Sequence, residues 1–415
     1  MPASPARRVA LDCLLQWESG TEFADALLQD QARRRQLDSP DRGLAQEILY
    51  TALRHLIFID RVIDRFRRGK IKSSTEALLR IGLAQLLKTE IADHAAIHET
   101  VELAKPHEKK LVNAILRSAQ RERESIEQES AEWDLADRES HPEFLIERWT
   151  EQYGAANAEA LCAWNNRPAP VFARINRLAA DKAAIERLAE EHKGRMLGPD
   201  FCDFFKIEGA PDPSALAAGL IYIQDPSTLA AIDLLDPKPG ESILDACAAP
   251  GGKSGLIASR IGSEGQLTAT DNVGKRLQRL RGNLDRLGAK EVEVAQVDWI
   301  AGDSGSALDG RQFDAILIDA PCSNTGVMRR RVDVRWRLQP WDFERQRATQ
   351  EGLIKALLPR LKPGGRLVYS TCSIDREENE GLLESLGLEA NQTRRSFPPE
   401  SGFDGSFAAR IQAKS

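Results

Sequence analysis

The sequence predicts a multidomain protein that consists of an all-helical bundle, a small α/β connector and a larger α/β domain with a mostly parallel sheet. Three observations lead to this fold class. Hydrophobic residues recur at helical spacing through the first part of the chain, a short alternating run appears near residue 171, and strand-like runs alternate with helical stretches from about residue 215 onwards. With 415 residues, the chain is long enough for two or three domains with their own cores. We predict boundaries at residues 1–135, 136–214 and 215–415.

The N-terminal region is predicted to be helical throughout. In the segment 56–66, apolar residues return every three or four positions, which places them on one face of a helix, and the segment 78–87 repeats this pattern. Ser39-Pro40-Asp41 is a plausible helix start, because serine is a favourable N-cap and proline is tolerated in the first turn. These patterns predict an all-α bundle.

The connector mixes helical and strand-like patterns. Residues 142–149 begin with a proline and continue as a helix, Val171–Asn176 alternates as a strand does, and residues 181–191 are helical again. This mixture predicts a small α/β module between two larger domains.

The C-terminal region repeats the order strand, turn, helix. Helical stretches lie between most of the strand-like runs, which favours a parallel sheet covered on both faces, and the last run is expected to be an antiparallel strand. The expected strands are residues 242–245, 266–271, 292–298, 313–319, 366–370 and a final strand within 402–411.

The composition is that of an ordinary globular protein, with 42% hydrophobic and 29% charged residues. No stretch approaches the roughly 20 apolar residues of a membrane span, and the N-terminus lacks the apolar core of a signal peptide. The six cysteines contain no CxxC pair and the six histidines form no pair at metal-ligand spacing. We therefore predict a monomeric cytoplasmic protein without a metal site and without a membrane partner.

Two basic clusters offset a net charge of −6, and nucleic-acid binding requires only such a local cluster. The first, within residues 61–72, is equally well explained as a solvated helix and loop face. The second follows Cys322 closely and is predicted to contact RNA phosphates. Its candidate RNA-binding residues are Arg329, Arg330, Arg331 and Arg335.

Small and acidic residues follow the first three expected strands of the C-terminal domain. Asp245 closes the first strand and precedes a Pro-Gly-Gly turn, Asp271 ends the second, and Asp298 ends the third. Small residues let a ligand approach the backbone, and carboxylates at strand ends can bond ribose hydroxyls or an adenine edge. Each aspartate alone could be a helix cap, but together they predict a nucleoside site that suits S-adenosylmethionine better than a dinucleotide.

Two cysteines end two further strand-like runs, Cys322 in Asp-Ala-Pro-Cys-Ser and Cys372 in Ser-Thr-Cys-Ser. A single strand-end cysteine is usually a small buried hydrophobic residue. Because the carboxyl ends of neighbouring parallel strands lie at the same edge, two such cysteines can face one substrate. We therefore predict that this pair carries the chemistry.

These motifs resemble the RNA cytosine-5 methyltransferases, and the resemblance covers nearly the whole chain. Residues 245–253 look like the family's cofactor loop, 319–326 like its Pro-Cys-Ser motif, and 370–379 like its Thr-Cys-Ser motif. The N-terminal region is similar to a NusB-type RNA-binding bundle, through Asp41-Arg42-Gly43-Leu44 and Val112-Asn113-Ala114 among other segments. This fusion resembles the bacterial 16S rRNA cytosine-5 methyltransferases of the RsmB (Sun/Fmu) group.

The resemblance implies a Rossmann-like class I methyltransferase domain, an RRM-like connector, and a cysteine that adds to C6 of the base so that C5 can accept a methyl group. It implies Cys372 as nucleophile and Cys322 as the residue for product release. Asp319, three residues before Cys322, can hydrogen-bond cytosine N3 if burial raises its pKa and it carries a proton. Lys253 is expected to reach the cofactor carboxylate or the RNA, with a surface helix lysine as the alternative. Residue by residue, the resemblance implies a cofactor site made by Cys247, Ala248, Ala249, Pro250, Gly251, Gly252, Lys253, Asp271, Arg276, Asp298, Asp319 and Pro321.

The implied substrate is one cytosine, position 967, of small-subunit ribosomal RNA before assembly. Two alternatives stay open at this point: a cytosine-5 methyltransferase of another RNA such as tRNA, and a non-catalytic NusB-like RNA-binding factor. A DNA cytosine methyltransferase is disfavoured, because no large insert separates the Cys372 strand from the last strand.

Overall fold

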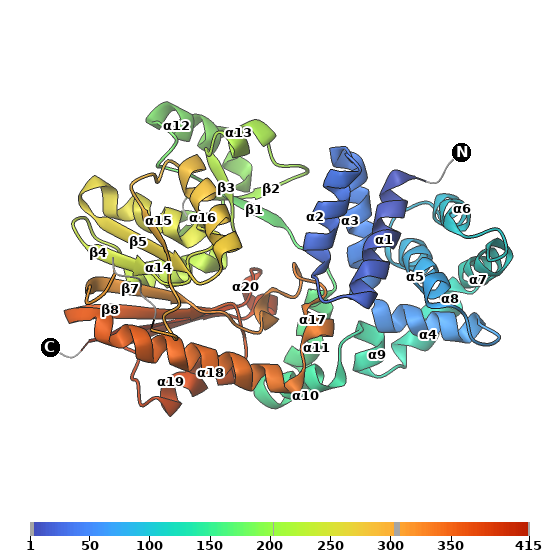
Figure 1. The fold of residues 1–415 in the computed structure, drawn as a ribbon. Helices are drawn as coiled ribbons and strands as arrows, with labels where there is room; N and C mark the ends of the chain where they lie inside the picture. Colours follow the sequence, from blue (N-terminus) through green and yellow to red (C-terminus); the bar gives the residue numbers. More distant parts are fainter. Residues whose placement is uncertain (1–3, 202, 303–307, 414–415) are drawn as a thin grey trace. The chain divides into compact units, whose positions relative to one another are not determined.

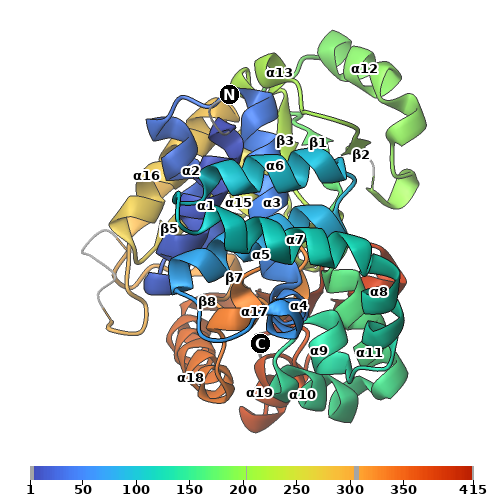
Figure 2. The ribbon, with the colours of Figure 1, turned by 90° about the vertical axis from the view of Figure 1, so that its right-hand side faces the viewer.

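The computed structural model describes residues 4–201, 203–302 and 308–413, which form two compact units (Figures 1 and 2). The helical unit consists of Met1–Pro168 and Met328–Leu338, and the α/β unit consists of Ala169–Val327 and Gln339–Ser415. The helical part thus extends past the predicted boundary at residue 135 and includes a short segment from far along the chain. Among the described residues, no helix is long and apolar enough to cross a membrane.

The helical unit confirms the predicted all-α bundle. Its helices are α1 (Pro5–Ser19), α2 (Ala24–Arg34), α3 (Ser39–Arg54), α4 (Leu56–Phe66), α5 (Ser73–Lys88), α6 (Asp93–Leu103), α7 (Lys109–Arg121), α8 (Arg123–Ala131), α9 (Leu135–Glu139), α10 (Glu143–Tyr153), α11 (Ala155–Asn165) and α17 (Val334–Arg337).

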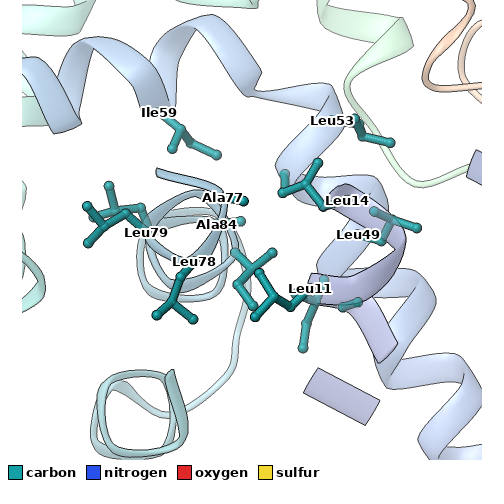
Figure 3. Close-up of a cluster of buried hydrophobic side chains, with 14 of the residues drawn as sticks. Leu11, Leu14, Leu49, Leu53, Ile59, Ala77, Leu78, Leu79 and Ala84 are labelled. Atoms are coloured by element: carbon teal, nitrogen blue, oxygen red, sulfur yellow. The ribbon is translucent and has the colours of Figure 1, made fainter. Parts of the chain in front are cut away.

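Leucines and isoleucines from α1, α3, α4 and α5 meet in the core of this bundle (Figure 3). Leu14, Leu49 and Leu79 are completely buried there, as the helical spacing predicts. The start of α3 differs by one residue from the prediction: Asp38, not Ser39, is the N-cap, and its carboxylate accepts a hydrogen bond from the Asp41 N–H.

The segment Met328–Leu338 corrects part of the predicted RNA-binding cluster. Arg335 is completely buried within the helical unit. Its guanidinium donates to the backbone carbonyls of Arg54, Ser140 and Asn165. These three carbonyls lie at the ends of α3, α9 and α11, where the helix dipoles favour a positive charge. Arg335 is therefore a structural cation of the bundle and is not available to RNA phosphates.

Arg329 is also occupied within the helical unit. Its guanidinium lies 4.1 Å from the centre of the Trp164 ring and donates to the carbonyls of Arg167 and Pro168. Arg330 is half-buried and Arg331 is exposed. A phosphate-facing role for Arg330 and Arg331 stays a prediction.

The α/β unit begins with a three-stranded antiparallel sheet in the order β2–β1–β3. Its strands are β1 (Val171–Ile175), β2 (Phe204–Ile207) and β3 (Ile221–Ile223), accompanied by α12 (Lys182–Glu191) and α13 (Pro213–Ala217). This is the predicted α/β connector, although its sheet extends past residue 214 and the helices α10 and α11 belong to the helical unit.

The second sheet of this unit has seven strands in the order β6–β5–β4–β7–β8–β10–β9. The first five in this order are parallel, and β10 is antiparallel to both β8 and β9, so the predicted fold class is confirmed. The strands are β4 (Ser242–Asp245), β5 (Gln266–Asp271), β6 (Glu293–Gln296), β7 (Phe313–Asp319), β8 (Leu361–Thr371), β9 (Gln392–Ser396) and β10 (Ser406–Gln412).

Helices cover both faces of this sheet, as expected for a parallel sheet of apolar strands. α18 and α19 pack on one face against Leu244, Ile316 and Ile318, while α14 and α15 pack on the other against Ile243 and Leu317. The helices of this part are α14 (Leu229–Leu235), α15 (Gly252–Ile261), α16 (Gly274–Arg286), α18 (Pro340–Leu357), α19 (Glu380–Ser385) and α20 (Pro398–Ser401).

The edge strand β9 is the one strand of the large sheet that the sequence analysis does not predict. Its sequence, Gln-Thr-Arg-Arg-Ser, is polar and mostly exposed, so it lacks the apolar alternation by which the other strands are found. Because its polar side chains do not pack in a core, this strand is ordered by its backbone pairing with β10.

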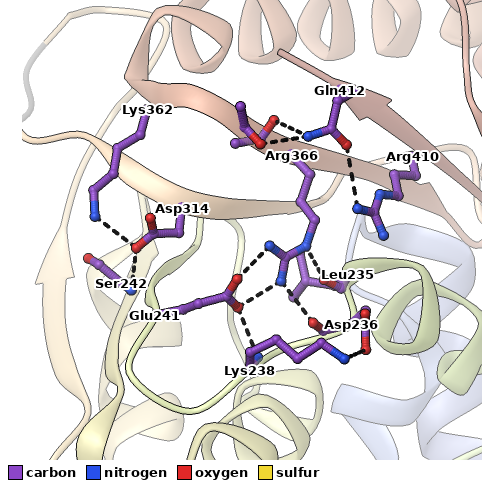
Figure 4. A network of polar contacts seen from close by, with 12 residues as sticks. Leu235, Asp236, Lys238, Glu241, Ser242, Asp314, Lys362, Arg366, Arg410 and Gln412 are labelled. Atoms are coloured by element: carbon purple, nitrogen blue, oxygen red, sulfur yellow. Dashed lines mark hydrogen bonds and ion pairs between the residues drawn. The ribbon is translucent and has the colours of Figure 1, made fainter. Parts of the chain in front are cut away.

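A polar network joins the strands at their amino ends (Figure 4). Arg366 of β8 makes a two-pronged ion pair with Glu241, at 2.7 Å for each prong, and donates to the carbonyls of Leu235 and Asp236. Lys362 and the Ser242 N–H both donate to Asp314. This end of the sheet is thereby closed by hydrogen-bonded charges.

Candidate active site

The opposite, carboxyl ends of the strands bring the predicted site residues together. β4 ends at Asp245, β7 at Asp319 and β8 at Thr371, one residue before Cys372. These three strands are neighbours in the order β4–β7–β8, and the pairing continues to their last residues, because the Ala320 N–H donates to the Ser370 carbonyl. The three motifs, which are far apart in the sequence, therefore lie side by side at this edge of the sheet.

The two cysteines face each other, with a distance of 3.3 Å between their sulfur atoms. Both are free thiols. The hydrogen bond to Cys372, together with burial and the charge of Glu378, raises the pKa of Cys322 well above its usual value. Cys322 is therefore the member of the pair that retains its proton.

Asn324 bridges the two cysteines. Its side-chain N–H donates to the carbonyl of Cys322 at 2.8 Å, and its side-chain oxygen lies 3.3 Å from the sulfur of Cys372, which donates to it. Asn324 has a φ of 61°, in the left-handed region that asparagine tolerates better than most residues. The turn after Cys322 thus directs one side chain at both thiols.

Direct contacts between their loops hold the two cysteines at this distance. The Gly326 N–H donates to the Cys372 carbonyl at 3.0 Å, and a Cβ at Gly326 would lie 2.6 Å from the Gly405 carbonyl oxygen, so no side chain fits there. The hydroxyl oxygens of Ser323 and Ser373 lie 3.1 Å apart, within hydrogen-bond distance. The loop after β7 and the loop after β8 therefore form one rigid unit.

A buried carboxylate completes this connection. Glu378 accepts hydrogen bonds from the N–H and the hydroxyl of Ser323, and from the Gln350 amide at 2.9 Å. Gln350 of α18 also donates to the carbonyl of Pro321, next to Cys322. Burial raises the pKa of Glu378, although its hydrogen bonds with serines oppose the shift. The carboxylate is thus fixed by donors rather than by a cation.

Lys253 and Asp319 form an ion pair beside the cysteines, with 2.7 Å between the ammonium nitrogen and the carboxylate oxygen. Burial alone would lower the pKa of Lys253, but the charges of Asp319, Cys372 and Asp245 keep it above its ordinary value. Asp319 retains a third of its side-chain exposure and accepts this ammonium. In this contact Asp319 is the acceptor, whereas the sequence analysis expected it to donate to cytosine N3.

The predicted cofactor loop forms the turn between β4 and α15. Gly251 has a φ of 106°, and a Cβ at Gly252 would lie 2.9 Å from the Tyr222 ring, so both positions require glycine. The carbonyls of Ala249 and Pro250 accept hydrogen bonds from Arg276 and Asn283 of α16. The side of the turn that faces the neighbouring cavity is therefore free of bulky side chains.

A cavity of about 200 Å³ lies between this turn and the segment 222–228. Asp245, Lys253 and Asp319 line it together with the loop residues Cys247–Pro250 and Gly252. Asp245 is completely buried; one carboxylate oxygen accepts from Ser254, and the other has no hydrogen-bond partner in the described part of the chain. Burial raises the pKa of Asp245 to about 7.

A second cavity, of about 70 Å³, adjoins Lys253 and Cys372. It is lined by small and hydroxyl-bearing residues, Ser227, Thr228, Ser370, Thr371, Gly405 and Ser406, with Asp225, Asp404 and Phe407 among the others. Cys372 thus borders a cavity, and several of its other lining residues can form hydrogen bonds.

Two of the predicted cofactor residues contact neighbouring groups of the chain, and their roles towards the cofactor stay predictions. Asp298 is exposed, and its carboxylate accepts from the N–H groups of Ile300 and Ala301 in a turn, not at the start of a helix. Asp271 is buried; one of its oxygens accepts from the Val273 N–H, and the other lies 3.3 Å from Arg276. Pro321 is exposed next to Cys322.

Sequence reasoning missed Tyr222, Gln224, Asn324 and Gln350. Tyr222 and Gln224 line the 200 Å³ cavity from β3 and the residues just after it. A signal existed for Gln224, because it directly precedes Asp225-Pro226 in a segment that matches the family pattern. Gln350 lies in the middle of a helix, where the sequence carries no indication of a contact with the cysteine loops.

These residues fit S-adenosylmethionine. The cofactor has an ammonium group that needs an acceptor, and Asp245 offers a buried carboxylate oxygen without a partner. A turn of small residues leaves room for a bulky ligand, and the Asp271 carboxylate closes the neighbouring strand. In the described residues, no group of three or more His, Cys, Asp or Glu side chains is placed to hold a metal ion.

Comparison with known proteins agrees with this arrangement. Residues 232–398 match the family model of the 16S rRNA methyltransferase RsmB/F, residues 4–121 match that of the NusB family, and residues 141–203 match that of the ferredoxin-like domain of RsmF/B-like methyltransferases. The three matches follow the helical bundle, the connector and the seven-stranded domain in order.

Curated relatives extend over nearly the whole chain. The chain is 35% identical to the probable ribosomal RNA small subunit methyltransferase B of Bacillus subtilis, over 99% of this chain and 94% of the relative. It is 34% identical to the ribosomal RNA small subunit methyltransferase B of Pseudomonas putida, over 92% of each chain. A solved structure titled PH0851 has the same fold, with a TM-score of 0.76, 23% identity and 98% coverage of both chains.

Proposed function

We propose that this chain, which belongs to the RsmB/F family of 16S rRNA methyltransferases, methylates C5 of a cytosine in small-subunit ribosomal RNA through a covalent cysteine adduct. It is an S-adenosylmethionine-dependent rRNA methyltransferase. The observation that carries the finer proposal is the pair of free thiols 3.3 Å apart at the ends of β7 and β8, beside the Lys253–Asp319 ion pair.

Cytosine C5 needs a nucleophile at its neighbour, because this carbon does not attack a methyl sulfonium unaided. The sulfur of Cys372 forms a bond to C6, and the electrons of the C5–C6 double bond move to C5. S-adenosylmethionine, when bound, supplies the methyl group that C5 then accepts. A base next removes the proton from C5, the double bond re-forms, and the C6–sulfur bond breaks.

The thiol pair supports the two cysteine roles. The raised pKa of Cys322 disfavours it as the attacking thiolate, and we therefore assign the role of nucleophile to Cys372. After the sulfur of Cys372 is bonded to carbon, Cys322 no longer donates to a thiolate, so the strongest interaction holding its proton is lost. Cys322, 3.3 Å from that sulfur, then releases its thiol proton to water, and the resulting thiolate accepts the C5 proton.

Lys253 and Asp319 suit the polar edge of the base. An ionised carboxylate accepts from the amino group of cytosine and from N3 when N3 carries a proton. The ammonium of Lys253, 2.7 Å from Asp319, is the closest source of that proton. We therefore assign Asp319 to the N3 edge of cytosine as an acceptor and Lys253 to proton supply.

The cysteine roles are tested by two substitutions. Cys372→Ala is expected to abolish methyl transfer, and Cys322→Ala is expected to accumulate a covalent protein–RNA adduct that survives a denaturing gel, because addition proceeds while elimination fails. Cys13→Ala, at a buried cysteine of the helical bundle, serves as the matched control and should behave as wild type. Normal product release by Cys322→Ala would show that the roles are assigned wrongly.

The target is tested by mapping 5-methylcytosine in ribosomal RNA from cells with and without this protein. We expect one cytosine, position 967 of the small-subunit RNA, to lose its methyl group, and purified protein to restore it on RNA that is not assembled into subunits. Loss of 5-methylcytosine from tRNA instead would favour the alternative substrate. A monomeric state and a cytoplasmic location also stay predictions, to be checked by light scattering and by fractionation.

A further inference from the structure

Gln224 lines the 200 Å³ cavity, and Arg174 lies behind it as its hydrogen-bond partner. Arg174 of β1 is buried, with 2% of its surface exposed. Its guanidinium donates from Nε to the side-chain oxygen of Gln224 at 2.7 Å and from Nη2 to the carbonyl of Gly252 at 3.3 Å. It also lies 5.4 Å from the centre of the Tyr222 ring. The three-stranded sheet thus braces the cofactor turn through this one side chain.

This contact determines which way the Gln224 amide points. A guanidinium has only donors, so the amide must turn its oxygen towards Arg174 and its NH2 group away from it. Gln224 lines the cavity, and no described residue accepts a hydrogen bond from that NH2 group. The cavity therefore has a positioned donor on the side of β3.

A second lining residue supplies the complementary group. Asp245, at the end of β4, has a buried carboxylate oxygen without a partner in the described residues and also lines the cavity. One donor and one acceptor in one small cavity match an α-amino acid, whose carboxylate needs donors and whose ammonium needs acceptors. The end of S-adenosylmethionine with these two groups is its methionine part.

We propose that the Gln224 NH2 group donates to the α-carboxylate of S-adenosylmethionine while Asp245 accepts from its α-ammonium. Arg174 is a positioning residue, since it acts on the cofactor only through Gln224 and Gly252. The proposal rests on the cofactor and not on the cysteine chemistry. A Cys372→Ala variant should consequently bind the cofactor as wild type does, and failure of one proposal leaves the other standing.

The test compares two ligands in calorimetric titrations of the full chain without RNA. S-adenosylhomocysteine has both groups of the amino acid, and its decarboxylated analogue keeps the ammonium but lacks the carboxylate. Gln224→Leu is expected to weaken S-adenosylhomocysteine about tenfold or more, the effect of one hydrogen bond to a charged group. It should leave the affinity for the decarboxylated analogue unchanged.

Two further variants sharpen this test. Gln224→Glu, which keeps the size of the side chain, should weaken S-adenosylhomocysteine further than Gln224→Leu, because a carboxylate then faces the ligand carboxylate. Arg174→Lys should show the same selective loss as Gln224→Leu, since a lysine ammonium cannot hold Gln224 and Gly252 together in one plane. Gln278→Leu, at an exposed glutamine of α16, is the matched control and should change neither affinity.

Equal weakening of both ligands by Gln224→Leu would overturn the proposal, and so would unchanged affinity for both in a variant that melts at the wild-type temperature. If Gln224→Leu does not fold, Gln224→Glu decides between the same outcomes. Wild-type binding of both ligands by Arg174→Lys would refute the positioning role of Arg174.

Discussion

Both ends of the seven-stranded sheet hold buried charges, but these charges are fully paired at the amino ends and only partly paired at the carboxyl ends. At the amino ends, Arg366 meets Glu241 with two hydrogen bonds and donates to two carbonyls as well. At the carboxyl ends, Asp245 keeps a buried oxygen without a partner, and Cys322 shares its hydrogen bond with a second thiol. One end is a finished structural network, whereas the other retains groups that only a ligand can satisfy.

This difference indicates that the amino ends of the sheet contribute stability, whereas the carboxyl ends are available for binding and chemistry. Pairing two charges fully lowers the cost of burying them, but it leaves nothing to bind a substrate. Leaving a carboxylate without a partner costs stability and creates affinity for a complementary group. Substitutions at the two ends should therefore affect different measurements.

The largest expected effect is on folding, at the amino end. Arg366→Met leaves Glu241 partly buried without its counter-ion, so the free energy of unfolding should fall by about 3 kcal/mol or more. Denaturant titration measures this loss, and methyl transfer by the protein that remains folded should be normal. A loss of activity in the folded variant would contradict the idea that the amino ends affect stability only.

The next effect is on activity, at the carboxyl end. Lys253→Met removes the ammonium beside Asp319 and should slow methyl transfer by about 100-fold or more, the contribution of a positioned proton donor. The free energy of unfolding should change little, because Asp319 remains partly exposed. Single-turnover assays with the enzyme in excess over RNA measure the rate of methyl transfer, and denaturant titration measures the free energy of unfolding. A variant that transfers methyl groups at the wild-type rate would contradict the assignment.

A pH dependence is the third prediction. The pKa of Asp245 is raised to about 7 by burial, so the folded protein holds this proton more tightly than the unfolded chain does. Its contribution to stability is therefore present at low pH and is lost as the pH rises towards 7. Cofactor affinity has the opposite sign, because only the ionised carboxylate accepts from an ammonium.

Calorimetric titration of S-adenosylhomocysteine should thus show affinity about tenfold lower at pH 6 than at pH 8. Asp245→Asn should bind weakly at both values and lose most of the difference between them. An unchanged pH dependence in this variant would show that Asp245 is not the group responsible.

The smallest expected effect is again at the amino end. Lys362 pairs with Asp314 at 2.8 Å, but 41% and 32% of the two side chains are exposed. Lys362→Met should therefore lower the free energy of unfolding by less than about 1 kcal/mol and leave methyl transfer unchanged. It is the matched lysine control for Lys253→Met, and a clear loss of activity would show that the sheet transmits changes from one end to the other.

Sequence reasoning predicted the fold class and the clustering of the strand-end residues, because both depend on local patterns. Strand ends are visible as Asp245, Asp319 and the residue before Cys372, and the rule that parallel strands present their carboxyl ends at one edge brings those positions together. The same reasoning failed for Arg335. From the sequence alone, arginines that bind phosphates cannot be distinguished from an arginine that donates to the carbonyls at three helix ends.

By itself, the sequence determined the three-part organisation, the glycine turn and the two cysteines that end neighbouring strands. The tertiary structure alone decided that Arg335 is buried in the bundle, that Glu378 joins the cysteine loops, and that Gln224 presents a donor to the cofactor cavity. The physical reason is how far apart in the sequence the interacting residues lie. Periodicity and turn chemistry are properties of a few consecutive residues, whereas the partners of these three side chains lie far away along the chain and meet them only in the folded protein.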